Sequence, residues 1–188
     1  ERECSIQRRH QKIIEESPSS RLTNKIREDI TSAAVKLGKK LNYKSAGTVE
    51  FLFDEDTNEF WFLEVNTRLQ VEHPVTEEVT GIDLVKEQIK IASGKKLDFL
   101  QEDIEFNGHA IEARLYAENP ENDFLPEIGS INKLSCANNK GIRWDTGIAT
   151  GDRITPDYDP MLAKVIAIGE TREQSAKLLA KELRSTHL

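Results

Sequence analysis

Two glutamates and an asparagine in residues 46–66 have the chemistry of a divalent-cation site. Two runs of β-forming residues flank the polar loop 54–59, a pattern that predicts a hairpin. Pairing the strands symmetrically about this loop places Glu50 opposite Glu64, with Asn66 one step along the same face. Paired carboxylates repel by roughly 1 kcal/mol or more unless a cation neutralises them, and Mg²⁺ prefers such hard oxygen ligands. The alternative is a solvated acidic face on a half-exposed hairpin.

The segment after this hairpin, residues 67–73, has no regular period and is predicted to be a loop with an anion site. Arg68 can bind a carboxylate or bicarbonate through its forked guanidinium group. Glu72, four residues later, could act as a base if it is held near the same ligand. A loop that follows a ligand-bearing strand often carries catalytic groups. The alternative is a surface ion pair between Arg68 and Glu72, which would contribute little.

Basic and amide side chains are concentrated in residues 7–12 of an otherwise acidic chain. Residues 4–16 are predicted to form one extended segment, in which alternation would place Arg8, His10 and Lys12 on one side. Such a stripe suits a phosphate or bicarbonate ligand. It would equally suit an exposed strand edge, where basic side chains protect against aggregation.

A second acid–base pair lies inside the predicted strand 108–117. Arg114 is expected on the same side of the strand as Glu112 and Tyr116. This arrangement indicates either an anion-binding arginine or a structural ion pair.

The elements that position these groups follow from periodicity. The hairpin pairing places Leu52 opposite Phe62 and predicts a face belonging to the core, formed by Val49, Phe51, Phe53, Trp61, Leu63 and Val65. Helices are predicted over 23–42, over 82–93 with Ile82, Val85, Ile89 and Ala92 inward, and from Thr171 with Ala176, Leu179, Ala180 and Leu183 inward. Short strands are predicted over 108–117, 128–135, 142–147 and 162–168.

Composition limits the class of protein. The chain has 188 residues, 37% of them hydrophobic, which is typical of a globular protein with a real core. A net charge of −7 argues against non-specific binding to nucleic acid. No apolar run approaches the roughly 18 residues of a membrane span. The sequence opens at Glu1 without an initiator methionine, so we expect an excised fragment.

Four segments of the chain together resemble the biotin carboxylase family. They are residues 3–12 (ECSIQRRHQK), 62–77 (FLEVNTRLQVEHPVTE), 108–114 (GHAIEAR) and 158–164 (YDPMLAK). The block 66–74 alone is highly specific, and the resemblance extends from residue 1 to about residue 184. It implies an α+β fold: the carboxy-terminal part of an ATP-grasp domain over 1–93, then a mostly antiparallel β biotin carboxylase C-terminal domain over 94–188, truncated at its end.

The resemblance also implies roles for individual residues. Divalent ions on the ATP phosphates would be held by Glu50, Glu64 and Asn66. The nucleotide would lie near Gln7, His10, Glu50, Leu52 and Glu64. Bicarbonate would be bound by Lys12, Arg68, Gln70 and Val71. Glu72 would deprotonate bicarbonate for attack on the γ-phosphate, and Arg68 and Arg114 would hold the carboxyphosphate and the biotin enolate.

The implied activity is ATP- and bicarbonate-dependent carboxylation of biotin. The expected cofactors and substrates are ATP, Mg²⁺ or Mn²⁺, bicarbonate and biotin. The expected partners are a biotin carboxyl carrier protein or domain, a carboxyltransferase subunit or domain, and a second copy in a homodimer, with no nucleic acid or membrane. The compartment would be the cytoplasm or the mitochondrial matrix. The final acceptor stays open among acetyl-CoA, propionyl-CoA, methylcrotonyl-CoA, pyruvate and urea systems.

The family's amino-terminal domain and glycine-rich lid do not occur in this sequence, so we expect the fragment to be inactive alone. An alternative is a non-catalytic dimerisation or interaction module, to which residues 104–188 would contribute. Another ATP-grasp ligase with the same carboxylate pair is disfavoured by the loop from Arg68 to Pro74.

Overall fold

The computed structural model describes residues 1–137 and 139–188, which form two compact units. The first unit contains residues 1–3 and 17–107, and the second contains residues 4–16 and 108–188. Helices and antiparallel strands occur in both, in agreement with the expected α+β class. The domain division expected at residues 93 and 94 stays a prediction.

The first unit opens with helix α1 (Asn24–Lys40), in agreement with the helix expected over 23–42. The Thr23 hydroxyl accepts a hydrogen bond from the Ile26 backbone N–H at 3.4 Å, which satisfies one of the free donors of the first turn. Lys39 and Lys40 lie in the last turn, where positive charge complements the helix dipole. All of α1 is at least partly exposed.

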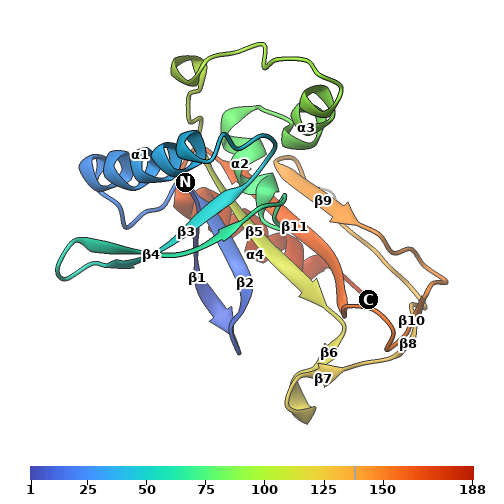
Figure 1. Ribbon diagram of the computed structural model, residues 1–188. Helices are drawn as coiled ribbons and strands as arrows, with labels where there is room; N and C mark the ends of the chain where they lie inside the picture. The colour runs from blue at the N-terminus through green and yellow to red at the C-terminus, as the bar shows by residue number, and fades with distance from the viewer. Residues whose placement is uncertain (138) are drawn as a thin grey trace. The chain divides into compact units, whose positions relative to one another are not determined.

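The predicted hairpin is present as β3 (Thr48–Asp54) and β4 (Glu59–Asn66), which form a two-stranded antiparallel sheet (Figure 1). Glu50 lies opposite Glu64, as expected. Leu52 lies opposite Trp61, so the expected pairing with Phe62 was wrong. A shift of register between Glu50 and Phe51 causes this difference, because an extra residue on one strand displaces every pair beyond it.

The expected buried face of the hairpin was also wrong. Trp61 and Leu63 are 49% and 50% exposed, and Leu52 and Phe62, which the predicted face excluded, are 57% and 58% exposed. Among the described residues no third strand pairs with these two, so they form no closed layer. Phe51 makes the edge-to-face aromatic contacts of the pair, with its ring centroid 5.5 Å from that of Phe60.

Helix α2 (His73–Thr80) was not predicted from the sequence. Pro74 lies in its first turn, which tolerates proline because that N–H has no partner within the helix. Val75 and Val79 are fully buried. The helix ends at Gly81, whose φ of 71° is the left-handed conformation that favours glycine.

Helix α3 (Leu84–Ala92) follows, capped by Asp83, and a short 3₁₀ turn, η1 (Gln101–Asp103), lies beyond it. The helix was expected, but its inward face was not predicted correctly. Val85 and Ile89 are 42% and 66% exposed.

The second unit is built on a five-stranded sheet with the order β1 (Glu3–Arg8), β2 (Gln11–Ser17), β5 (His109–Tyr116), β11 (Met161–Gly169) and β9 (Ile142–Thr146). β11 pairs with both β5 and β9 in antiparallel register. Helix α4 (Arg172–Ser185) packs against β5, β11 and β9 (Figure 1). The core beneath α4 contains Ile111, Ala113, Val165, Ala167 and Leu179, with Ile14, Ile142, Trp144, Leu178 and Leu183 partly buried around it.

Helix α4 begins as expected, with the Thr171 hydroxyl accepting a hydrogen bond from the Gln174 backbone N–H at 3.3 Å. Leu179 is buried as predicted, but Ala176 is exposed. The helix instead buries Ser175 and Glu182, two polar residues that hydrophobic periodicity cannot detect.

Polar contacts compensate for the burial of these two side chains. The Ser175 hydroxyl donates to the His109 carbonyl oxygen at 2.5 Å. Glu182 accepts from the Trp144 indole N–H at 2.9 Å and from the Asn139 amide at 2.6 Å. Such partners remove most of the desolvation cost of a buried polar group.

Two predicted strands differ from the structure. Residues 4–16 are not one extended segment, because Arg9 and His10 form a turn between β1 and β2 with φ values of 51° and 64°. Alternation therefore does not continue from Arg8 to Lys12. The strand expected over 128–135 is mostly irregular. It contains β8 (Gly129–Ser130), which pairs with β10 (Arg153–Ile154).

A small hairpin follows β5. Its strands are β6 (Glu118–Asn119) and β7 (Leu125–Pro126), and the 3₁₀ turn η2 (Pro120–Asn122) lies between them. Among the described residues, no helix is both long and apolar enough to cross a membrane.

Candidate functional site

The central feature of the first unit is the carboxylate pair on the β3–β4 hairpin. Glu50 and Glu64 are cross-strand neighbours, and both are bonded to a single amide. The Asn66 side-chain nitrogen donates to Glu50 Oε1 at 3.1 Å and to Glu64 Oε1 at 2.8 Å. The positive end of the amide dipole therefore lies between two anions that would otherwise repel.

The donor set of this pair fits a hard divalent cation. It consists of two carboxylates and one amide, and a half-turn of the Asn66 amide would present its oxygen in place of its nitrogen. Mg²⁺ typically takes one or two protein carboxylates and fills its remaining positions with water and phosphate oxygens. Within the described part of the chain, no group of three or more His, Cys, Asp and Glu side chains forms a metal cage. An all-protein metal site is thus not what these residues offer.

A network of hydrogen bonds orients the Glu50 carboxylate. Gln70 is only 6% exposed, and its amide nitrogen donates to Glu50 Oε1 at 2.7 Å. The amide oxygen of Gln70 accepts in turn from Arg2 Nη2 at 2.8 Å. Arg2 also donates to the hydroxyl groups of Thr48 at 3.0 Å and Thr76 at 3.1 Å. This chain of hydrogen bonds orients one carboxylate of the pair.

No pattern in the sequence indicated the Arg2 network. Arg2 is separated from Gln70 by 68 residues, and nothing in the sequence links it to Thr48 or Thr76. Gln70 was expected to bind bicarbonate, and here its amide group contacts Glu50 and Arg2. These contacts leave its expected role a prediction.

Three further predicted residues of the first unit lie after β4. Arg68 is exposed, and its guanidinium donates to the Leu69 carbonyl oxygen at 3.2 Å. Val71 is half-buried in the turn before α2. Glu72 is 2% exposed at the N-cap position of α2. Buried placement suits a base that must keep its proton exchange away from bulk water.

Leu52, expected near the adenine, is 57% exposed on β3. The side chain is large, apolar and open to solvent, which is compatible with contact to a flat aromatic ring.

The remaining predicted residues belong to the second unit. Gln7, near the end of β1, is exposed and donates to the Cys4 carbonyl oxygen at 2.9 Å. His10 is exposed in the turn between β1 and β2. Lys12 is half-buried on β2.

Arg114 lies on β5, directly opposite Lys164 of β11. Its Nε donates to Glu15 Oε1 at 2.6 Å, and Glu15 is fully buried. Burial raises the pKa of Tyr116, on the same side of β5, although a hydrogen bond with Arg114 acts in the opposite direction. The ion pair expected as an alternative role for Arg114 therefore exists, with a partner that the sequence did not reveal.

A second ion-pair cluster involves the neighbouring carboxylate of β2. Glu16 Oε2 lies 2.6 Å from His109 Nε2, and Arg172 donates to both Glu16 oxygens at 2.6 and 2.9 Å. Burial alone would raise the pKa of Glu16, but the hydrogen bonds from Arg172 and His109 outweigh it and hold that pKa below its ordinary value. This cluster joins β2, β5 and the start of α4.

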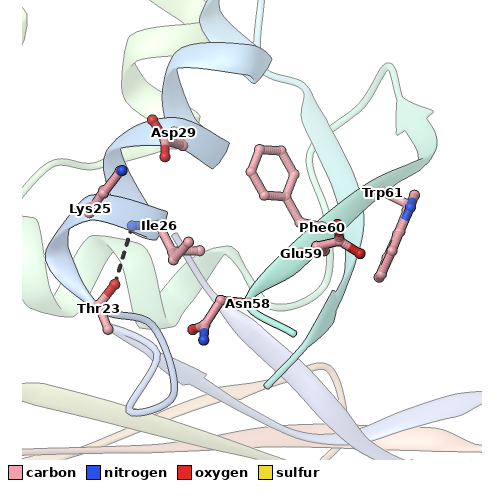
Figure 2. Close-up of a pocket in the computed structure, with 8 residues that line it drawn as sticks. All are labelled: Thr23, Lys25, Ile26, Asp29, Asn58, Glu59, Phe60 and Trp61. Carbon is pink, nitrogen blue, oxygen red and sulfur yellow. Dashed lines mark hydrogen bonds between the residues drawn. The ribbon is translucent and has the colours of Figure 1, made fainter. Parts of the chain in front are cut away.

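A hollow of about 640 Å³ lies elsewhere in the first unit, between α1 and the far end of the hairpin (Figure 2). It is lined by Thr23, Lys25, Ile26, Asp29, Asn58, Glu59, Phe60 and Trp61. Its described lining includes none of the predicted site residues. The hollow is therefore separate from the carboxylate pair.

Comparisons with known proteins cover nearly the whole chain. Residues 1–100 match the family model described as carbamoyl-phosphate synthase L chain, ATP binding domain, and residues 112–188 match that of the biotin carboxylase C-terminal domain. The chain is 52% identical over 184 residues to biotin carboxylase 2 of Bacillus subtilis, covering 98% of this chain and 41% of that protein. It is 47% identical over 189 residues to the alpha subunit of the mitochondrial methylcrotonoyl-CoA carboxylase of Rattus norvegicus, covering 100% of this chain and 26% of that protein.

Solved structures give the same result. The biotin carboxylase domain dimer of the Hydrogenobacter thermophilus 2-oxoglutarate carboxylase, in complex with MgADP, ADP and bicarbonate, matches with a TM-score of 0.95 at 45% identity. That match covers 99% of this chain and 41% of the solved chain. The urea carboxylase of Kluyveromyces lactis matches with a TM-score of 0.94 at 47% identity, covering 99% of this chain and 16% of the solved one.

The chain thus spans about 41% of the length of the bacterial biotin carboxylases that it matches. Its two family models follow one another in the order expected from the sequence blocks. On these grounds the chain belongs to the biotin carboxylase family.

Proposed function

We propose that the protein containing this chain is a biotin carboxylase, which uses ATP and bicarbonate to carboxylate biotin. The observation that carries the proposal is the Glu50–Glu64 pair, which converges on one amide and is oriented by Gln70. Such a pair has little structural purpose on an exposed hairpin, whereas a nucleotide with bound Mg²⁺ makes use of it.

Glu50, Glu64 and Asn66 would hold Mg²⁺ or Mn²⁺ against the ATP phosphates. When bound, the ion would neutralise charge that develops on the phosphates during transfer. Gln7, His10 and Leu52 would contact the nucleotide itself. Gln7 and His10 can donate hydrogen bonds, and Leu52 offers an apolar surface.

Bicarbonate would be bound by Lys12, Arg68, Gln70 and Val71, the first two supplying positive charge. Glu72 would take the proton of bicarbonate, so that a bicarbonate oxygen attacks the γ-phosphorus of ATP and ADP leaves. The carboxyphosphate formed would break down to CO₂ and phosphate. The released phosphate would take the proton of the biotin ureido nitrogen, and the deprotonated nitrogen would then attack CO₂.

Arg114 would stabilise the biotin enolate as negative charge moves onto the ureido oxygen. The fully buried Glu15 supports this role, because its carboxylate restricts the rotation of the guanidinium at a distance of 2.6 Å. Arg68 would bind the carboxyphosphate with its exposed guanidinium fork.

The domain division and the partners are part of the same proposal. Residues 1–93 would belong to an ATP-grasp domain and residues 94–188 to the biotin carboxylase C-terminal domain. A biotin carboxyl carrier and a carboxyltransferase would act with the whole protein. Relatives named as parts of larger carboxylases support this, such as a pyruvate carboxylase subunit of Methanothermobacter thermautotrophicus. A homodimer is supported by the Hydrogenobacter structure, which was solved as a dimer.

The test uses the whole protein and measures bicarbonate-dependent ATP hydrolysis with free biotin. Glu64→Gln removes one anion from the pair, and we expect kcat/KM to fall about 100-fold because the metal–phosphate complex loses a charged ligand. Glu59→Gln, at the start of the same strand and also exposed, should leave kcat/KM within a factor of about two.

Two results would contradict the proposal. One is a wild-type protein whose ATP hydrolysis does not respond to bicarbonate. The other is a Glu64→Gln variant as active as Glu59→Gln.

A further inference from the structure

The turn between β1 and β2 has a conformation that needs external support. Arg9 and His10 have φ values of 51° and 64°, and residues with side chains rarely adopt such angles. Two positive φ values in succession are typical of a type I′ hairpin turn, which usually selects Asn or Gly. A strained conformation persists when its surroundings fix it. This turn carries His10, and Lys12 follows it on β2.

The guanidinium of Arg8, the last residue of β1, has two partners on the β6–β7 hairpin. It forms an ion pair with Glu118, whose side chain is only 9% exposed. Its central carbon also lies 4.0 Å from the centroid of the Phe124 ring, over the ring face. An arginine paired with a carboxylate and stacked on an aromatic ring loses most of its rotational freedom.

A second contact joins the same two segments. Arg9, the first residue of the turn, forms an ion pair with Asp123, next to Phe124. The two arginines lie where the chain reverses, and both are bound by one hairpin. The β6–β7 hairpin therefore anchors the last residue of β1 and the first residue of the turn.

The β6–β7 hairpin is itself well defined. The Phe124 backbone N–H donates to the Asn119 carbonyl oxygen at 2.8 Å. The Asn119 side-chain amide donates to Glu127 Oε1 at 2.6 Å, and the Glu127 N–H donates to the Ala117 carbonyl at 2.8 Å. A hairpin with its own hydrogen-bond network can act as a fixed support rather than a passive loop.

We propose that Arg8, clamped by Glu118 and Phe124, is a positioning residue that holds the β1–β2 turn so that His10 and Lys12 meet the nucleotide and bicarbonate. The inference rests on the proposed function and adds a role for the β6–β7 hairpin, which carries none of the residues proposed to bind a ligand. Arg8 acts through the residues that follow it and is not itself a ligand.

The test is carried out on the whole enzyme with Arg8→Lys. This change keeps the positive charge but loses the flat face that stacks on Phe124 and the fork that binds Glu118. We expect KM for ATP to rise about tenfold while the thermal unfolding midpoint stays near that of the wild type. Arg21→Lys is the matched control, because Arg21 pairs with Glu55 at 3.1 Å on an open surface.

Variants of the ring give a second, independent arm. Phe124→Leu removes the aromatic face and should raise KM for ATP in the same direction as Arg8→Lys. Phe124→Tyr keeps the face and should restore the wild-type KM. If the ring had a purely structural role, KM for ATP in both variants would change only in step with their thermal stability. That result would contradict the inference.

A double-mutant cycle with His10→Ala separates positioning from unrelated damage. If Arg8 acts through His10, the double variant should have a KM for ATP close to that of His10→Ala alone. Additive effects, or an Arg8→Lys variant no worse than Arg21→Lys, would overturn the inference while leaving the proposed function intact. A wild type without bicarbonate-dependent ATP hydrolysis would instead overturn the proposed function.

Discussion

The β3–β4 hairpin and the β5–β11 pair are both antiparallel, yet their apolar side chains have opposite exposures. Val165 and Ala167 of β11 are fully buried, whereas Trp61 and Leu63 of β4 are about half exposed, at 49% and 50%. Helix α4 packs over β5 and β11, while the hairpin forms a sheet of two strands.

The difference concerns how each region holds its charged groups. In the five-stranded sheet a hydrophobic core lies beneath α4, and ion pairs such as Arg114–Glu15 are added to it. On the hairpin the carboxylate pair is held by a chain of polar contacts through Gln70 and Arg2. Packing thus fixes the five-stranded sheet, and hydrogen bonds fix the hairpin.

The largest expected effect comes from truncating Leu179 in the sheet, and Leu63 on the hairpin provides the comparison. Leu179→Ala removes a side chain that is 5% exposed in the core of the sheet. We expect the free energy of unfolding of that region to fall by about 2–5 kcal/mol, through lost burial and a residual cavity. Leu63→Ala on the hairpin should cost less than about 1 kcal/mol. Amide hydrogen exchange, read separately for β11 and β4, measures both. Equal losses in the two strands would mean that the contrast in packing is wrong.

A smaller effect is expected when the polar support of the hairpin is cut. Gln70→Ala leaves Glu50 and Arg2 without the amide that joins them. We expect the hairpin to lose about 1–3 kcal/mol of local stability, because a buried hydrogen-bonding partner is removed. The readout is hydrogen exchange at the backbone amides of β3 and β4, with β5 as the internal reference.

Gln88→Ala is the matched control, since the Gln88 amide donates at 3.3 Å to Ser45 on an exposed surface. Faster exchange in β5 as well would indicate general damage rather than loss of the network. Unchanged exchange in β3 and β4 would mean that Gln70 does not hold Glu50.

The smallest expected effect is on the acid stability of the sheet. The pKa of Glu16 in the folded chain lies below its ordinary value of 4.5, so this carboxylate stabilises the fold above that pH. The stabilisation is lost as the pH falls through the lowered folded pKa, because protonation breaks the contacts with Arg172 and His109. Glu16→Gln should therefore unfold with a weaker dependence on pH below 4.5.

The measurement is urea unfolding between pH 6 and pH 3, followed by the fluorescence of Trp144 in a Trp61→Phe background. Glu173→Gln is the control, because Glu173, next to Arg172 on α4, is exposed and forms a surface ion pair with Lys177. If Glu16→Gln keeps the wild-type pH dependence, the cluster contributes nothing to acid stability.

Periodicity predicted much of the fold where one face of an element is buried and apolar. It placed the β5 and β11 strands and the cap of α4 correctly. It placed Leu179 and Leu183 of α4 against the core correctly. It missed Ser175 and Glu182, because these are buried with polar partners that lie 66 and 38 residues away in sequence. It missed α2, an eight-residue helix that directly follows a loop motif.

The site was predicted in part for a similar reason. Symmetric pairing about a polar loop was sufficient to bring Glu50 opposite Glu64. The bulge one residue further along could not be foreseen, since it depends on backbone geometry rather than on residue type. The supports Arg2 and Glu15 were missed because each acts on a side chain that is distant in sequence.

The charged residues of strand β2 restrict its register in the sheet more tightly than its apolar residues do. Its apolar residues Ile13 and Ile14 are identical neighbours, so a slip by one position would still offer an isoleucine to the core. The two glutamates that follow are also identical, but a slip in either direction leaves one of their two positions without a carboxylate. Glu15 binds Arg114, whereas Glu16 binds His109 and Arg172 from the opposite side of the strand. A slip would move one of these carboxylates away from its cations, so charge specifies a register that hydrophobicity leaves ambiguous.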